Sequence, residues 1–272
     1  KTSDKDLLLI GTGNVGKYYI DFKKPIKIAR RNEEITYFSY QPEYKEVWDK
    51  LYSEKIIFRE IAKDITCVYD PGVYANLTGL YFIKVSSFET KNYFCLLTIL
   101  NSSLIDLVFK TLYGTLHMSG EYLRFNGSFI KTIPIPDNLP LTLSYMGKIL
   151  QFLSHLKYEI LYDSNYRLIN EIKIKDILNP LNFYEKLSNS LVNQLYLCSE
   201  QYNALNKFLD SSILIPNIEF KFMNSRYELP NYITYKKGEI KENLNQIIKS
   251  FNLLRKDSKL ISQMNSILAK QM

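Results

Sequence analysis

A glycine pattern near the amino end of the chain could hold a phosphate group. Gly11 to Gly16 read G-T-G-N-V-G and directly follow a short apolar stretch, Leu7 to Ile10. In dinucleotide-binding enzymes such glycines bring the backbone close to a pyrophosphate at the start of a helix. The next residues, Lys17 to Phe22, favour a strand instead, and Pro25 leaves little room for a helix. An NADP-dependent oxidoreductase is therefore an alternative, and we prefer a glycine-rich turn.

Basic side chains interleaved with tyrosines follow this turn. Ammonium and guanidinium groups neutralise phosphates, while phenols pack and donate hydrogen bonds. We call this segment the basic arm and predict that it faces a nucleic-acid backbone. A solvated charged loop is the competing interpretation. Its basic residues are Lys17, Lys23, Lys24, Lys27, Arg30 and Arg31.

Composition supports a folded, basic protein. The 272 residues are 46% hydrophobic, which is enough for a sizeable core. The formal net charge of +7 favours an acidic partner such as nucleic acid, although many soluble proteins are modestly basic. The length allows one large domain or two of ordinary size.

Cysteine and histidine positions argue against a disulfide framework or a metal site. Cys67, Cys95 and Cys198 lie far apart and resemble small buried hydrophobes in a reducing compartment. His117 and His155 are isolated from other metal-binding side chains. Neither a signal peptide nor a membrane-spanning run is predicted, so we expect a cytoplasmic protein without a membrane partner. The first residue is not methionine, and we expect a fragment of a longer polypeptide.

The stretch from Lys91 to Pro136 organises the chain. Lys91 to Leu112 predict one helix that is too apolar for a surface position, with Asn92 as its cap and Gly114 at its end. A polar pair inside it, Asn101-Ser102, is predicted to bond neighbouring backbone. The helix is therefore expected in the core.

The second half of this stretch changes character. Tyr122 to Ile130 predict extended chain around a turn at Asn126-Gly127. Pro134 and Pro136 then favour an extended exit. A domain boundary is predicted after this exit.

Four segments in this order resemble one known family. They are K-I-I-F-R-E-I-A (Lys55 to Ala62), L-x-x-I-L-N-S-x-L (Leu97 to Leu104), Y-L-R-F (Tyr122 to Phe125) and F-I-K-x-I-P-I-P (Phe129 to Pro136). The chain resembles here the TaqI-like C-terminal specificity domain of adenine-specific DNA methyltransferases and fused restriction–modification enzymes. It is also similar to target-recognition domains of type I specificity subunits. The resemblance covers roughly Leu8 to Pro136.

The resemblance implies double-stranded DNA as the partner, read in the major groove by loops and strand ends of a sheet. There Arg or Lys can hold guanine, and Asn or Gln can hold adenine. Only Arg59, Arg124 and Lys131 fall on positions that match the family pattern. Besides the basic arm, the candidate DNA-binding residues are Arg59, Lys63, Lys84, Arg124, Asn126 and Lys131, with Asn76, Tyr113, His117 and Ser119 as further positions.

The catalytic signature of such methyltransferases is missing from the sequence. These enzymes hold a flipped adenine with an Asn/Asp-Pro-Pro-aromatic motif, and Asn179-Pro180-Leu181 lacks the second proline and the aromatic residue. We therefore expect no catalytic residue and no cofactor in this chain. S-adenosylmethionine would belong to a catalytic methyltransferase domain or subunit. The chain would be part of a fused enzyme or, alternatively, a separate type I specificity subunit.

The predicted fold class is α+β. Residues 1–137 are expected to form a mixed β-sheet recognition domain with a buried helix. Its predicted elements are strands at Leu7–Ile10, Ile56–Phe58, Ile65–Tyr69 and Leu80–Val85, and a helix at Glu43–Tyr52 that carries Trp48 as a core anchor. Residues 138–272 are expected to form a mainly helical C-terminal region. Its predicted elements are helices within Tyr145–Leu161, Leu181–Leu197, Tyr202–Leu209 and Ile240–Met272, and a hairpin of Ile218–Phe222 with Tyr232–Tyr235.

Overall fold

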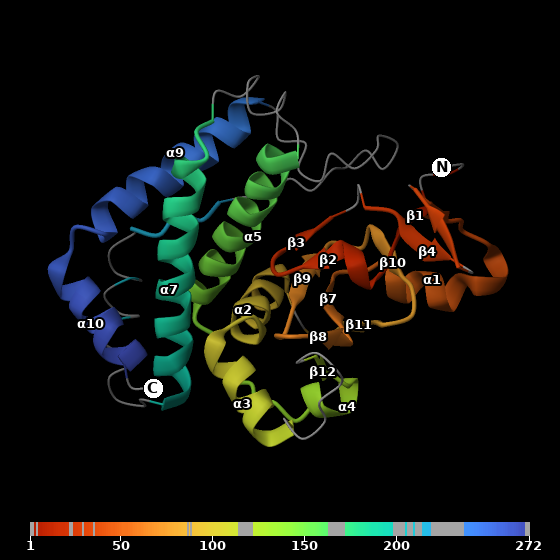
Figure 1. Ribbon diagram of the computed structural model, residues 1–272, viewed down its shortest axis with the longest axis horizontal. Coiled ribbons are helices and arrows are strands. Elements are labelled where there is room, and N and C mark those ends of the chain that lie inside the picture. Colours follow the sequence, from red (N-terminus) through yellow and green to blue (C-terminus); the bar gives the residue numbers. More distant parts are fainter. Residues whose placement is uncertain are drawn as a thin grey trace.

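The computed structural model shows a helical side and a β-rich side. It describes residues 3, 5–21, 24–28, 30–34, 36–85, 87, 89–113, 122–162, 172–197, 205, 209, 214–218 and 237–269. The long helices lie on one side, the strands lie on the other, and helix α1 lies at the far edge of the strands (Figure 1). The α+β class is therefore confirmed.

Two three-stranded sheets form the β-rich side. The first has the order β11-β7-β9, with antiparallel strands at Leu80–Ile83, Lys55–Arg59 and Cys67–Asp70. The second has the order β10-β1-β6, with strands at Tyr74–Asn76, Leu7–Ile10 and Tyr37–Phe38. Strand β1 pairs parallel with β10 and antiparallel with β6. The second sheet is therefore mixed, as the sequence predicts for the recognition domain.

The alternation of side chains along β7 places two cores on opposite faces of the first sheet. Ile56 and Phe58 belong to the core that is shared with the helices. Ile57, between them, packs instead with Leu8 and Ile10 of the second sheet. Successive side chains of a strand point to opposite faces, so β7 is buried on both.

Helix α1 (Lys45–Leu51), preceded by the short helix η2 (Pro42–Tyr44), covers the outer face of the second sheet. Leu7 and Trp48 share a small core there. The indole Nε1 of Trp48 donates a hydrogen bond of 2.9 Å to the backbone oxygen of Lys5. The prediction of Trp48 as a core anchor is confirmed.

The single long helix predicted from Lys91 is wrong, because the chain breaks it into two. Helix α2 (Thr90–Leu100) and helix α3 (Ser103–Tyr113) meet at an angle of 59°. At the break, the amide of Asn101 exchanges two 3.0 Å hydrogen bonds with the backbone N–H and C=O of Cys67 on β9. The predicted cap Asn92 lies inside α2, and Gly114 lies outside the described residues. The structural role predicted for Asn101 is confirmed.

The predicted hairpin around Asn126-Gly127 is also wrong. Strand β12 (Leu123–Arg124) pairs with β8 (Ile61–Ala62), so its partner lies far upstream in the sequence. Asn126 caps the one-turn helix α4 (Gly127–Ile130) by accepting a 3.2 Å hydrogen bond from the Ser128 N–H. An Asn-Gly pair serves hairpin turns and helix starts equally well, and here the distant pairing of β12 decides between them.

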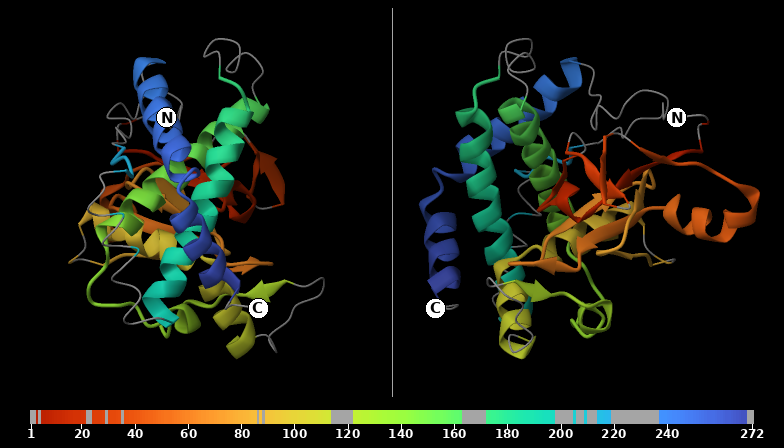
Figure 2. Two further views of the ribbon diagram at one scale, coloured as in Figure 1. Left: turned by 90° about the vertical axis from the view of Figure 1, so that its left-hand side faces the viewer. Right: turned by 45° about the vertical axis from the view of Figure 1, so that its right-hand side comes forward.

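The C-terminal half is mainly helical, as predicted. Helix α7 (Lys175–Leu197) contacts α5 (Leu141–Tyr162), α9 (Lys237–Leu254) and α10 (Ser258–Ala269), and Figure 2 shows α5 and α7 side by side. Helix α7 begins earlier than predicted and holds Pro180 in its first turns. Most of the predicted helix at Tyr202–Leu209 and of the following hairpin lies outside the described residues.

Helix α5 packs tightly against α2. A side chain at Gly147 would overlap the carbonyl oxygen of Phe94. One hydrophobic core includes α2, α5 and α7 together with the inner face of the first sheet. The boundary at residues 137/138 stays a prediction, since the residues on both sides of it contribute to this core.

No single helix among the described residues is long and apolar enough to cross a membrane. Within those residues, only the bent pair α2 and α3, when the two helices are counted together, reaches the length and apolar composition of a membrane span. The thiols of Cys67 and Cys95 are free and buried, and Cys198 lies outside the described residues.

An ion pair without solvent contact joins strands β7 and β9. The side chains of Lys55 and Asp70 are both 0% exposed, and the ammonium also donates to the backbone oxygen of Leu51. The Asp70 carboxylate accepts 2.9 Å hydrogen bonds from the N–H groups of Gly72 and Val73, and these bonds stabilise the turn at Asp70-Pro71-Gly72.

Removing one partner of this pair should destabilise the fold strongly. We expect Lys55→Met to lower the free energy of unfolding by about 3–5 kcal/mol, because Asp70 would keep a buried, uncompensated charge. Chemical denaturation would measure this. Lys50→Met, at an exposed position of α1, is the matched control and should stay within about 0.5 kcal/mol. A loss below about 1 kcal/mol for Lys55→Met would contradict the expectation.

The buried His155 of α5 should make stability depend on pH. Burial lowers its pKa from the usual 6.5 to about 3. Between these two pH values His155 binds a proton in the unfolded chain and stays neutral in the folded chain. Stability should therefore fall as the pH drops below 6.5. Between about pH 7 and about pH 5, the wild-type protein should lose about 2 kcal/mol more than His155→Gln does. Equal losses in urea titrations of the two proteins would refute this.

Candidate nucleic-acid interface

The glycine motif forms a structural turn around Asn14. After β1 the chain makes a short helix, η1 (Thr12–Asn14), and a hairpin of β2 (Val15–Gly16) with β3 (Tyr19–Ile20). The Asn14 side chain is buried, accepts a hydrogen bond from the Gly11 N–H (2.8 Å) and donates to two backbone oxygens, those of Asp21 (2.6 Å) and Lys24 (2.7 Å). In the described residues that come directly after the motif, strands β2 and β3 replace the α-helix whose N-terminus could receive a pyrophosphate. The structure gives the dinucleotide alternative no support.

A two-stranded antiparallel ribbon follows this turn. Among the described strands, β4 (Ile26–Ile28) and β5 (Arg31–Glu33) pair only with each other, and we call residues 24–28 and 30–34 the basic ribbon. Figure 1 places β4 at the end of the molecule opposite α9 and α10. The ribbon therefore lies on the opposite side of the molecule from these two helices.

Four predicted DNA-binding residues gather on the basic ribbon. They are Lys24, Lys27, Arg30 and Arg31, and all four are exposed. None of these side chains forms an ion pair with another described residue. The carboxylates of Glu33 and Glu34 also lie on the ribbon, but farther from its tip. Lys27, Arg30 and Arg31 therefore concentrate positive charge near the tip, without an ion-pair partner among the described residues, whereas Lys24 lies at the base of the ribbon.

Lys17 lies on a different turn. It is exposed in the β2–β3 hairpin, beside Tyr18, which is buried and has a positive φ of 66°. A hydrogen bond from Lys110 holds the pKa of the Asp64 carboxyl below its usual value, and the charge of Lys17 contributes to this lowering. Lys17 therefore lies near a carboxylate, unlike the tip of the ribbon. Lys23 lies outside the described residues.

Of the candidates around β8 and β12, Arg124 and Lys63 already contact other groups. Arg124 contacts one carboxylate oxygen of Glu60 through both Nε and a terminal nitrogen, at 2.7 Å each. Lys63 is exposed and lies 5.9 Å from the ring centre of Tyr122. Arg59 is half-buried, and its buried Nε has no hydrogen-bond partner in the described part of the chain. The two family-pattern arginines, Arg59 and Arg124, are therefore close in the fold but differ in environment.

The remaining candidates are scattered. Lys84 and Lys131 are exposed, after β11 and after α4. Asn126 uses its side-chain oxygen as a helix cap, which leaves its NH₂ group available. Two further positions bond within the protein: Asn76 donates to the Leu80 oxygen at 3.0 Å, and the Tyr113 hydroxyl lies 2.9 Å from that of Thr132. His117 and Ser119 lie outside the described residues. DNA contact by each candidate stays a prediction.

Sequence reasoning missed Asn32, which is exposed on β5 and pairs in register with Lys27. Strands of three residues give little periodicity, so this segment was predicted only as an arm. The alternation in Ile26-Lys27-Ile28 is the signal that could have indicated a ribbon with one polar face.

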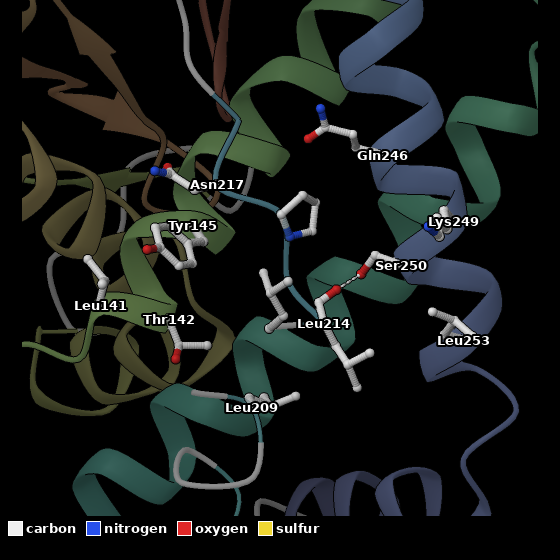
Figure 3. A pocket seen from close by; sticks show the side chains of 12 residues that line it. Leu141, Thr142, Tyr145, Leu209, Leu214, Asn217, Gln246, Lys249, Ser250 and Leu253 are labelled. Atoms are coloured by element: carbon white, nitrogen blue, oxygen red, sulfur yellow. Dashed lines mark hydrogen bonds between the residues drawn. The ribbon is translucent and has the colours of Figure 1, made fainter. Parts of the chain in front are cut away.

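A pocket on the helical side is a poor match for a phosphate backbone. It has a volume of about 720 Å³ and lies between the start of α5 and α9 (Figure 3). Its walls include Leu141, Leu214 and Leu253, and Lys249 is the one charged residue among the described residues that line it. The ribbon is therefore the better candidate for nucleic acid.

Comparison with known families confirms the resemblance in the same half of the chain. Residues 8–135 match the family model of the TaqI-like C-terminal specificity domain. The match begins in β1 and ends just before α5, so it includes both sheets, the basic ribbon and the buried helix α2. It indicates a DNA-recognition specificity domain of a methyltransferase or restriction system. No curated protein matches the chain.

Loss of the Asn14 amide should loosen the base of the ribbon. We expect Asn14→Ala to lower the free energy of unfolding by about 1–3 kcal/mol, because it removes three partly buried hydrogen bonds to the backbone of Gly11, Asp21 and Lys24. Chemical denaturation would measure the loss, and amide NMR shifts should change across residues 24–33. Asn138→Ala, at an exposed position, is the control. A stability equal to that of the control would show that the side chain is dispensable.

Proposed function

We propose that this chain is the target-recognition region of an adenine-specific DNA methyltransferase or restriction–modification enzyme. It would bind double-stranded DNA and read a short sequence in the major groove. The observation that carries the proposal is the specificity-domain match over residues 8–135, a segment that includes the exposed cations of the basic ribbon. Such cations suit phosphates, because neutralising them releases condensed counterions.

The chemistry would be performed outside this chain. The sequence that comes nearest to the adenine-binding motif, Asn179-Pro180-Leu181, lies inside α7, where Pro180 and Leu181 are buried in the helical core. A buried helix interior cannot present its backbone and an aromatic face to a flipped base. We infer that a catalytic domain or subunit binds S-adenosylmethionine and transfers the methyl group. Co-purification of a separate methyltransferase chain would distinguish a specificity subunit from part of a fused enzyme.

A salt titration tests the proposal directly. Binding of a labelled duplex, followed by fluorescence anisotropy, should weaken steeply with rising salt, with a slope of about −0.9 for each phosphate contacted. A duplex that the protein enriches from a random library should also outcompete a scrambled duplex of equal length. Salt-insensitive binding, or equal competition by every duplex, would argue against sequence-specific recognition.

Charge-matched variants would locate the contact surface. We expect Lys24→Gln with Arg31→Gln to lower the magnitude of the salt slope by about 2, with a similar loss of affinity for all duplexes. Lys256→Gln with Lys259→Gln removes the same charge from exposed positions at the α9–α10 turn, and it should leave the slope unchanged. Equal effects of the two double variants would place the DNA elsewhere.

A further inference from the structure

We propose that the basic ribbon enters the major groove, and that Lys27 and Asn32 form its base-reading pair. Asn32 would hold an adenine and Lys27 a guanine on neighbouring base pairs. This inference rests on the proposed function and deepens it, because it names the reading element and the base types that it selects.

The register of the ribbon puts these two side chains on one face. Lys27 is directly opposite Asn32, while Ile26 is opposite Glu33 and Ile28 is opposite Arg31. Ile26 is 4% exposed and turned toward Gly11, so its face packs against the protein. Side chains alternate between faces along a strand. Lys27 and Asn32 therefore point away from the protein, and both are exposed.

The dimensions of the ribbon suit the groove. A B-DNA major groove is about 12 Å wide and admits a two-stranded ribbon, whose strands lie about 4.8 Å apart. Directly opposed side chains have Cβ atoms about 5 Å apart. Successive base pairs are about 3.4 Å apart along the axis, so the pair can reach two neighbouring base pairs.

The chemistry of the pair is complementary to two base edges. An Asn amide can accept from adenine N6 and donate to N7, and a Lys ammonium can donate to guanine O6 and N7. Neither side chain has a hydrogen-bond or ion-pair partner among the described residues, so neither must break an internal contact to bind. By contrast, Arg124 would have to leave Glu60.

The base of the ribbon is fixed before DNA arrives. Asn14 holds the backbone oxygens of Asp21 and Lys24, and the Asp21 carboxylate accepts from the Lys24 N–H at 3.0 Å. The same carboxylate accepts a hydrogen bond from the Tyr158 hydroxyl of α5, which ties the ribbon to the helical core. A rigid support lowers the entropy lost on binding and fixes which bases the side chains meet.

The test is selection from a library of duplexes with a randomised centre, using the full chain at one fixed salt concentration. The wild-type protein should enrich a sequence in which an A·T pair neighbours a G·C pair. Asn32→Ala should lose the preference at the A·T position, and Lys27→Ala that at the G·C position, each by about 5- to 150-fold. The exposed variants Asn265→Ala and Lys259→Ala on α10 are matched controls and should enrich the wild-type sequence.

A single-atom change in the DNA sharpens the result. Replacing the enriched adenine by 7-deazaadenine removes the N7 acceptor, so it should weaken wild-type binding but not binding by Asn32→Ala. If the wild-type protein enriches a sequence that both ribbon variants retain, this inference fails and the proposed function stands. If the wild-type protein enriches no sequence, the proposed function fails as well.

Discussion

Strand β7 has no face in contact with solvent, and this constraint governs the arrangement of the rest. It is the central strand of its sheet, so both of its edges are paired. Ile56 and Phe58 must be covered by helices, and Ile57 must be covered by the second sheet. Even Lys55, at the start of the strand, is buried and needs the Asp70 carboxylate, because burying an ammonium without a counterion is very costly.

Covering β7 also joins the two halves of the chain. Helix α2 lies on its inner face, but α2 is itself almost entirely apolar and must be enclosed in turn. Helix α5 encloses it, at a contact so close that position 147 has no room for a side chain. The segment that matches the specificity domain ends at residue 135, but its hydrophobic core also contains side chains of the later helices α5 and α7. The helical region is needed to finish that core, whatever else it contacts.

The sequence predicts the elements whose signal is local. Strands β1, β7, β9 and β11 and the long helices follow from apolar periodicity, and Trp48 is recognisable as an anchor. The predictions are wrong where a contact with a residue distant in the sequence determines the local structure. The break between α2 and α3 depends on Asn101 meeting the Cys67 backbone, and the failure of the Asn126-Gly127 hairpin depends on β12 pairing with β8. Short strands such as β4 and β5 exist through pairing alone, so Asn32 could not be recognised as a ribbon residue from the sequence.

The distribution of charge matters more for DNA binding than its total. The net charge is +7, but dissolved salt screens the field of each exposed charge beyond about 8–10 Å. The attraction that a cation exerts on DNA therefore depends on the charges close to it. Lys110 is held between Asp64 and Asp106, and Arg124 is held by Glu60, so their fields are largely cancelled locally. The cations near the ribbon tip have no such partner in the part of the chain that the structure describes. Two of the three family-pattern positions are Arg59 and Arg124. Arg59 is half-buried, and Arg124 is bound to the Glu60 carboxylate. Both are therefore better suited to stabilising the ends of the strands than to attracting a duplex. Attraction and reading would then fall to the ribbon, whose sequence can vary without disturbing β7.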